Sequence, residues 1–100
     1  MTEIVLDLHD VTDTPSLFAK FDGIIVSEWG RNYDALYDCL SDLFEGGFTQ
    51  AYDFPLTLSI MHWEEFQSAH PHDYERLTRV FTDLIRYFHE KGKVLKVNFV

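Results

Sequence analysis

Residues 29–40 read Trp-Gly-Arg-Asn-Tyr-Asp-Ala-Leu-Tyr-Asp-Cys-Leu, and this stretch predicts a helix with two contrasting faces. Asn32 suits the N-cap, because its side-chain oxygen can accept a hydrogen bond from a backbone N–H group of the first turn. At about 100° per residue, the apolar side chains that follow fall on one side of the helix and four carboxylates fall on the other. These carboxylates, which we call the acidic stripe, are Asp34, Asp38, Asp42 and Glu45. Gly46-Gly47 predicts the helix end, near residues 44–45.

The acidic stripe does not help folding. Carboxylates four residues apart on a helix repel each other by roughly 0.2–0.5 kcal/mol per pair, and no Lys or Arg within this helix offsets them. An ordinary solvated helix face is the plain alternative. We favour contact with a positively charged molecule. The residues that lead into the helix support this choice, since Gly30 gives the backbone freedom there and Asn32 caps the helix. Trp29 and Tyr37 flank it, and contact with a partner or partial burial in the core would explain them equally well.

Charge is unevenly distributed along the chain. The 100 residues carry 17 acidic and 8 basic side chains, for a net charge of −9, and 46% of them are hydrophobic. This composition predicts one folded domain spanning residues 1–100. Seven acids and a single base, Arg31, lie between residues 22 and 53, whereas six of the eight bases lie at or after residue 76. Such a chain should repel nucleic acid and attract basic proteins.

The sequence predicts a cytoplasmic protein. Met1-Thr2-Glu3 opens without the apolar stretch of a signal peptide, and no apolar run reaches the ~18 residues of a transmembrane helix. The single cysteine, Cys39, can form no disulfide within the chain and is expected to be a small buried thiol. We expect no membrane contact, and a monomer when the protein is free.

Hydrophobic periodicity predicts three strands and four helices. The expected strands are residues 3–8, 55–61 and 93–100, and the expected helices begin near Pro15, run from the cap at Asn32, and span 63–69 and 73–91. Thr14 is the expected N-cap of the first helix, with Pro15 in its first turn. Helices between successive strands imply right-handed crossovers, so we predict an α/β fold with a mostly parallel sheet packed by helices.

Enzyme and metal sites are not expected. The carboxylates of the acidic stripe share one helix face with no convergent base, which argues against acid–base catalysis and against a metal-dependent hydrolase. The five histidines are scattered along the chain, and His70-Pro71-His72 has no cysteine or carboxylate at the spacing of a zinc site. We therefore expect no cofactor and no metal.

Residues 29–40 resemble the barstar family of intracellular ribonuclease inhibitors. The shared pattern is aromatic-Gly-x-Asn-x-Asp-Ala-Leu-aromatic-Asp-Cys-Leu, without a gap. The likeness elsewhere rests on the order of the elements and on Pro55-Leu56, on Trp63 with Phe66, and on the apolar strand after Lys91-Gly92. The resemblance implies a three-stranded parallel sheet flanked by about four helices. It also implies that the acidic helix plugs the active site of a barnase-like ribonuclease and mimics RNA phosphates.

Carried over residue by residue, the resemblance places Asp38 where a substrate phosphate would sit. The other residues that the resemblance places at the partner are Trp29, Gly30, Asn32, Asp34, Tyr37, Ser41, Glu45 and, from the long helix, Asp83. Asp42 is expected there as a member of the acidic stripe. Such a protein would serve as the immunity protein, or antitoxin, of a ribonuclease toxin.

Three differences from the family pattern support an alternative. Glu28-Trp29 replaces two tyrosines, Arg31 adds a base, and Asp42-Leu43 replaces Gly-Trp. The alternative is a barstar-fold binding module that recognises a different basic partner, such as a toxin that is not a ribonuclease.

Overall fold

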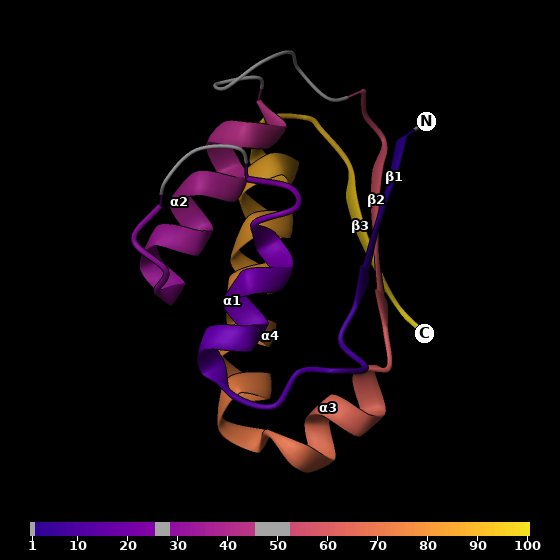
Figure 1. Ribbon diagram of the computed structural model, residues 1–100. Coiled ribbons are helices and arrows are strands. Elements are labelled where there is room, and N and C mark those ends of the chain that lie inside the picture. The colour runs from indigo at the N-terminus through magenta and orange to yellow at the C-terminus, as the bar shows by residue number, and fades with distance from the viewer. Residues whose placement is uncertain (1, 26–28, 46–52) are drawn as a thin grey trace.

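The elements occur in the predicted order, β-α-α-β-α-α-β, in the computed structural model, which describes residues 2–25, 29–45 and 53–100 (Figure 1). They are β1 (Thr2–Asp7), α1 (Thr14–Phe21), α2 (Tyr33–Phe44), β2 (Leu56–Met61), α3 (Trp63–Ala69), α4 (Pro71–Glu90) and β3 (Leu95–Phe99). None of the described helices is long and apolar enough to cross a membrane. The predicted helix stop at Gly46-Gly47 lies outside the described residues.

The sheet is parallel, as predicted, with β2 in the middle of the order β1-β2-β3. Thr2 pairs with Leu56, and Leu56 pairs with Leu95. Figure 1 shows α1, α2 and α4 on one side of the sheet and α3 at the end where β1 and β2 finish. The opposite face is partly open: Val5 is 54% and Met61 37% exposed. Parallel sheets are usually covered on both faces, so this one-sided arrangement is a departure from the general rule.

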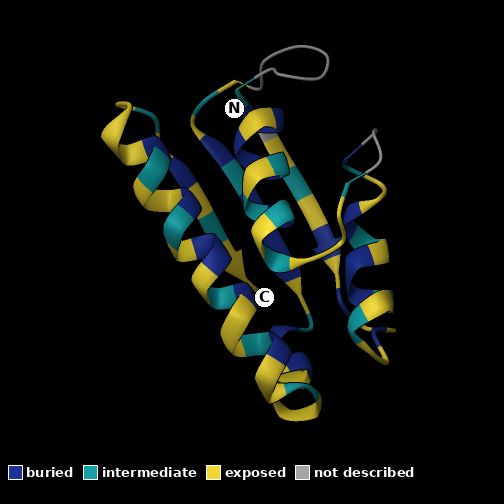
Figure 2. Cartoon of the chain, turned by 90° about the vertical axis from the view of Figure 1, so that its left-hand side faces the viewer, coloured by how far each residue is buried: buried dark blue, intermediate teal, exposed yellow. Residues whose placement is uncertain are grey.

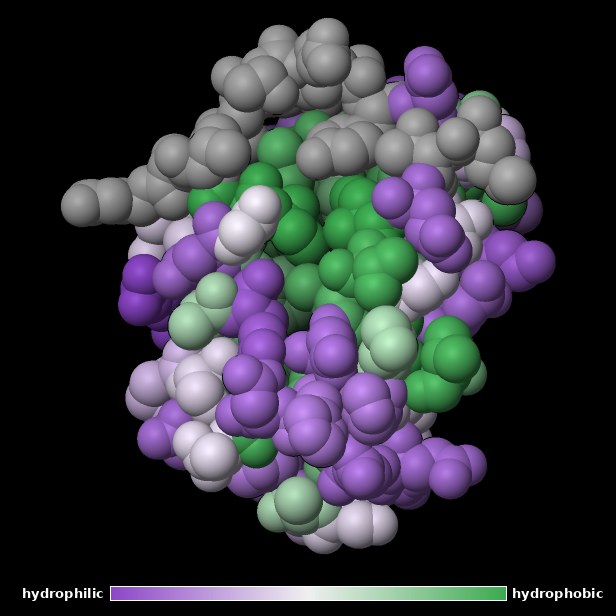
Figure 3. Space-filling view, turned by 45° about the vertical axis from the view of Figure 1, so that its right-hand side comes forward, coloured by the Kyte–Doolittle hydropathy of each residue, from purple (hydrophilic) through white to green (hydrophobic). Residues whose placement is uncertain are grey.

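The core lies between the sheet and the helices. The strands place alternate side chains inward, and each long helix presents one apolar stripe, as the 3.6-residue period requires. Fully buried side chains include Leu17, Phe21, Leu36, Leu40, Phe44, Leu56, Leu58, Ile60, Leu77, Leu84 and Phe88. Figure 2 looks onto α2 between α4 and α1, with buried residues turned inward and exposed residues outward. The sheet-side view in Figure 3 has a hydrophobic area in its upper part and mostly hydrophilic side chains below.

The predicted cap of the first helix was wrong. Asp13, not Thr14, is the N-cap of α1, because Asp13 and Ser16 form a reciprocal capping box. The Asp13 carboxylate accepts a hydrogen bond from the Ser16 N–H at 2.9 Å, and the Ser16 hydroxyl accepts one from the Asp13 N–H at 3.0 Å. Thr14 is thereby free to contact α4, as described below.

The other helix starts agree with prediction to within two residues. Asn32 caps α2 as expected, and α3 spans the predicted residues 63–69. The long helix α4 starts at Pro71 rather than at residue 73, since proline fits the first turn, where its missing N–H would have no helical partner.

Candidate functional site

The acidic stripe begins at a well-capped helix start. The Asn32 side chain accepts a hydrogen bond from the Ala35 N–H at 2.8 Å, which fixes the first turn of α2. Asp34, Asp38 and Asp42 follow at intervals of one turn, and all three are exposed. Among the described residues, none makes a hydrogen bond or ion pair with these three carboxylates. They are therefore available to a partner.

Glu45, the last member of the acidic stripe, is engaged within the protein. Its carboxylate accepts hydrogen bonds from the Tyr87 hydroxyl and from Lys91 Nζ, the latter at 3.2 Å. The Tyr87 hydrogen bond, followed by Lys91, lowers the pKa of Glu45. Both partners lie at the end of α4, so the spacing of charges within α2 gave no sign of them. Glu45 acts as a tie between helices and is only in part available to another molecule.

A groove of about 570 Å³ runs between α2 and α4. Its walls carry four carboxylates and two guanidinium groups. It is lined by Tyr33, Asp34, Tyr37 and Asp38 from α2 and by His72, Glu75, Arg76, Arg79, Val80 and Asp83 from α4. The structure therefore brings Asp83 together with three of the residues predicted on α2. It also adds bases opposite the acidic stripe that had not been considered.

The α4 side of the groove follows a helical pattern that the sequence contains. Its lining residues recur every three or four positions from His72 to Asp83, which puts them on one face of the helix. The apolar period of this helix predicted its buried face, and the polar period marks the face that lines the groove. Arg76 packs over the Tyr33 ring, with 5.4 Å from its guanidinium carbon to the ring centroid. This cation–π contact holds one of the two bases against α2.

Comparison with known proteins agrees with this geometry. The family model described as barstar (barnase inhibitor) matches residues 1–100. The chain belongs to the barstar family. Family membership confirms the predicted fold, and it confirms the expectation that the protein is an inhibitor rather than an enzyme. No curated protein matches the sequence significantly.

A buried tie positions α2 in this member of the barstar family. Asp73, 8% exposed in the first turn of α4, accepts hydrogen bonds from the Tyr33 hydroxyl at 2.5 Å and from the Thr14 hydroxyl at 2.9 Å. Burial, and then the hydrogen bond to Asp73, raises the pKa of Tyr33, so its hydroxyl remains a donor. The contact joins the starts of α1, α2 and α4. Sequence reasoning missed it, because the three residues are brought together only by the fold.

The loop before α2 is held by Asp22. Its carboxylate accepts hydrogen bonds from Trp29 Nε1 at 3.0 Å and from Arg31 at 2.7 Å. The indole also packs edge-on against Phe18, with ring centroids 5.5 Å apart. Trp29 is therefore half-buried and already bonded. Arg31, predicted as a base beside the site, is neutralised in part by Asp22.

Gly30 is needed for close packing rather than for backbone freedom, which corrects the prediction. The residue in the left-handed region is its neighbour Arg31, with a φ of 49°. A Cβ atom at Gly30 would lie 3.1 Å from Asn32 Nδ2 and 3.3 Å from the Ala35 Cβ. Both contacts are tighter than ordinary van der Waals packing, so a side chain here would press on the N-cap of α2.

The remaining predicted contacts divide between core and surface. Ser41 is buried, and its hydroxyl donates to the Asp38 carbonyl at 2.9 Å, so the structure does not bring it to the surface as expected. Tyr37 is half-buried in the groove and meets Tyr87 edge-on. Burial, and then the Asp83 charge, raises the pKa of Tyr37. Asp42 is exposed but does not line the groove.

Proposed function

We propose that this chain inhibits a barnase-like ribonuclease by inserting the first turns of α2 into the enzyme's active site. The observation that carries the proposal is the pair Asp34 and Asp38. Both carboxylates are exposed on successive turns of a capped helix and have no partner among the described residues. In this proposal Asp38 takes the position of an RNA phosphate. Membership of the barstar (barnase inhibitor) family supports the same partner class.

The electrostatics suit such a partner. A ribonuclease must bind a phosphodiester, so its cleft concentrates cationic side chains that an acidic helix can meet. Opposite charges speed the encounter over long range, and the pairs that lose water on binding slow dissociation. Losing one member of such a pair costs roughly 2–5 kcal/mol, a range established in part on barnase and barstar themselves. The net charge of −9 adds to the attraction.

The inhibitor would bind with little reorganisation. The Asn32 cap fixes the first turn of α2, and Asp73 ties that turn to α1 and α4 through Tyr33 and Thr14. A helix that is already in its bound orientation avoids much of the entropy cost of ordering on association. This rigidity supports a role as an active-site plug.

One observation favours a second candidate. Arg76 and Arg79 line the same groove as Asp34 and Asp38, which gives the surface both signs of charge. A uniformly basic cleft would meet repulsion from these guanidinium groups, whereas a partner with an acidic side chain beside its basic ones would not. The second candidate is thus a barstar-fold module for a different basic protein, such as a toxin that is not a ribonuclease.

The wider biological proposal follows from inhibition. The protein would form a single domain over residues 1–100, act as a monomer in the cytoplasm, and serve as the immunity protein of a ribonuclease toxin. A producing cell needs such an inhibitor where its own RNA is exposed. Binding of nucleic acid is not part of the proposal, because the net negative charge opposes it.

Inhibition of RNA hydrolysis by barnase tests the proposal. Wild type should inhibit, more strongly at low salt than at high salt, and Asp38→Asn should lose most of the inhibition. Glu64→Gln is the matched control, because it removes one exposed carboxylate from α3, away from the groove. Equal inhibition by all three proteins would remove Asp38 from the site. No inhibition by wild type would favour the second candidate.

A further inference from the structure

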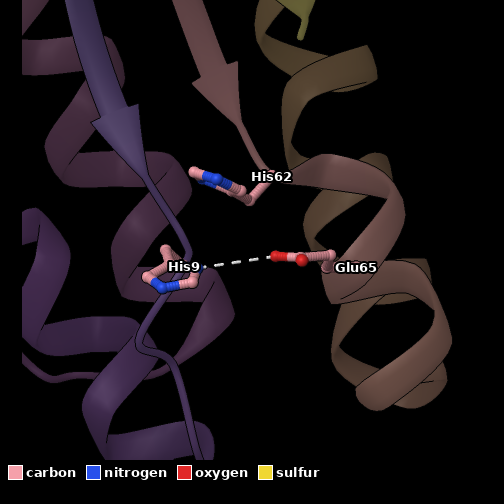
Figure 4. Close-up of side chains that lie close together, drawn as sticks. All are labelled: His9, His62 and Glu65. Atoms are coloured by element: carbon pink, nitrogen blue, oxygen red, sulfur yellow. Dashed lines mark ion pairs between the residues drawn. The ribbon is translucent and has the colours of Figure 1, made fainter.

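Three metal-binding side chains meet at the end of the sheet, away from the groove. His9 follows β1, His62 follows β2, and Glu65 lies in the first turn of α3. Figure 4 shows the three side chains turned toward one another. Their candidate ligand atoms all lie within 4.8 Å of one another, and His9 Nδ1 is 3.6 Å from the Glu65 carboxylate. The expectation that the histidines stay scattered was wrong for this pair, because parallel strands bring their carboxyl ends to one edge.

Asp7 holds one of these histidines in a defined orientation. Its carboxylate lies 2.7 Å from His62 Nδ1 and also accepts a hydrogen bond from the His9 N–H at 2.9 Å. With Nδ1 engaged, Nε2 is the free ring nitrogen of His62. A carboxylate on the second ring nitrogen is the usual support of a histidine that binds a metal, since it fixes the tautomer and the ring orientation.

The backbone of His62 is an independent sign of constraint. Its φ is 61°, in the left-handed region that residues other than glycine seldom adopt. Although His62 occupies the N-cap position of α3, its side chain makes no capping hydrogen bond. An unfavourable backbone conformation that serves no helix cap is typical of a residue held for another role.

We propose that His9, His62 and Glu65 bind one divalent transition-metal ion of the zinc class. Two imidazoles and a carboxylate suit Zn²⁺, whereas Mg²⁺ and Ca²⁺ prefer sites made of oxygen atoms. Tetrahedral bonds of about 2.0–2.1 Å to nitrogen place ligand atoms about 3.4 Å apart, so the side chains must close by up to about 1.4 Å. The His9 and Glu65 side chains are 67% and 66% exposed, which leaves them free to make this movement.

Binding would link two connections of the fold. His9 belongs to the segment between β1 and α1, and the other two ligands belong to the segment from β2 into α3. A metal that binds only the folded protein raises its melting temperature by mass action. None of the three ligands lines the groove between α2 and α4. Zinc should therefore change stability without changing ribonuclease inhibition, and the site stands or falls independently of the proposed function.

Calorimetric titration of the untagged chain with ZnCl₂ tests the site. Wild type should bind one equivalent of Zn²⁺ and no Mg²⁺. His9→Gln and Glu65→Gln should each weaken binding about tenfold or more, whereas Glu64→Gln and His89→Gln, which leave the cluster intact, should bind as wild type does. At the same zinc concentration, the melting temperature of wild type and of both controls should rise, and that of the two ligand variants should rise clearly less.

The Asp7→Asn variant tests whether Asp7 positions the His62 ring for metal binding or only stabilises the fold. The variant should keep one site, weaken zinc binding by about 10- to 100-fold, and change the ¹⁵N shifts of the His62 ring through its tautomer. His62→Asn is the third ligand variant, since asparagine tolerates the left-handed conformation. If His62→Asn fails to fold, the comparison of wild type with Glu65→Gln decides whether the zinc site exists, because Glu65 is exposed. Absence of zinc binding, or equal binding by wild type and Glu65→Gln, would overturn the proposal and leave His9 and Glu65 as a surface ion pair.

Discussion

Asp38→Asn should move stability and binding in opposite directions. Asp38 lies four residues from Asp34 and four from Asp42, so the change removes two like-charge pairs. At roughly 0.2–0.5 kcal/mol each, their removal stabilises the fold by about 0.4–1 kcal/mol at low salt. For a domain of this size that corresponds to a rise of about 2–8 °C in melting temperature. Asparagine is the better replacement than alanine, since its helix propensity is close to that of aspartate.

The same change should weaken inhibition strongly. If the Asp38 carboxylate meets a cationic side chain that is buried in the complex, its loss costs roughly 2–5 kcal/mol, or about 30- to 5,000-fold in affinity. Thermal unfolding and titration of barnase activity measure the two effects on the same preparations. The rise in melting temperature should fade in high salt, which screens exposed charges. A clear fall in melting temperature would mean that Asp38 supports the fold, and would refute the assignment.

Three further changes test the scaffold of the site. Tyr33→Phe keeps the ring but removes the hydrogen bond to the buried Asp73, and it should lower the free energy of unfolding by about 1–3 kcal/mol in chemical denaturation. Gly30→Ala should destabilise the start of α2 by crowding the Asn32 cap, and should weaken barnase inhibition as well. Glu45→Gln should reduce the decrease in the free energy of unfolding as the pH is lowered. Hydrogen bonding lowers the pKa of Glu45 in the folded protein from its ordinary 4.5, so its stabilising contribution is present above that value and is lost as pH falls through the lower folded pKa.

Each of these tests has its own contrary result. Unchanged unfolding of Tyr33→Phe would mean that water replaces the lost hydroxyl and that the tie is not structural. Gly30→Ala with wild-type inhibition would show that the loop relaxes without moving α2. If Glu45→Gln unfolds in acid as wild type does, the link between α2 and the end of α4 does not contribute to the pH dependence of stability.

Much of the fold could be predicted because its signals are local. The Asn32 cap, the short helix 63–69 and the alternation in the strands each depend on residues a few positions apart. The first helix cap was missed for a local reason too, since Asp13 and Ser16 form a box that competes with the threonine and proline beside them. In that case two capping patterns overlapped, and the one with two reciprocal hydrogen bonds prevailed.

The site could be predicted only on the α2 side. Spacing within one helix placed Asp34 and Asp38 together, but it carried no information on which residues α4 would set opposite them. Arg76 and Arg79 line the groove because α4 packs beside α2 in the fold. The histidine pair at the end of the sheet was missed for the same reason, since the register of two strands brings His9 and His62 together.

The carboxylates of this face differ in function because they differ in surroundings. Asp73 is buried and accepts two hydroxyl hydrogen bonds, so it orients α2, and Glu45 is tied to α4 by a tyrosine and a lysine. Asp34 and Asp38 have no such partner among the described residues, although they lie on the helix that the other two hold in place. The fold uses the first two carboxylates as hydrogen-bond acceptors. The second pair accepts no hydrogen bond from the described residues, and its mutual repulsion is offset in part by the two arginines across the groove. The unpaired carboxylates are therefore the ones for which a partner outside the chain is the best explanation.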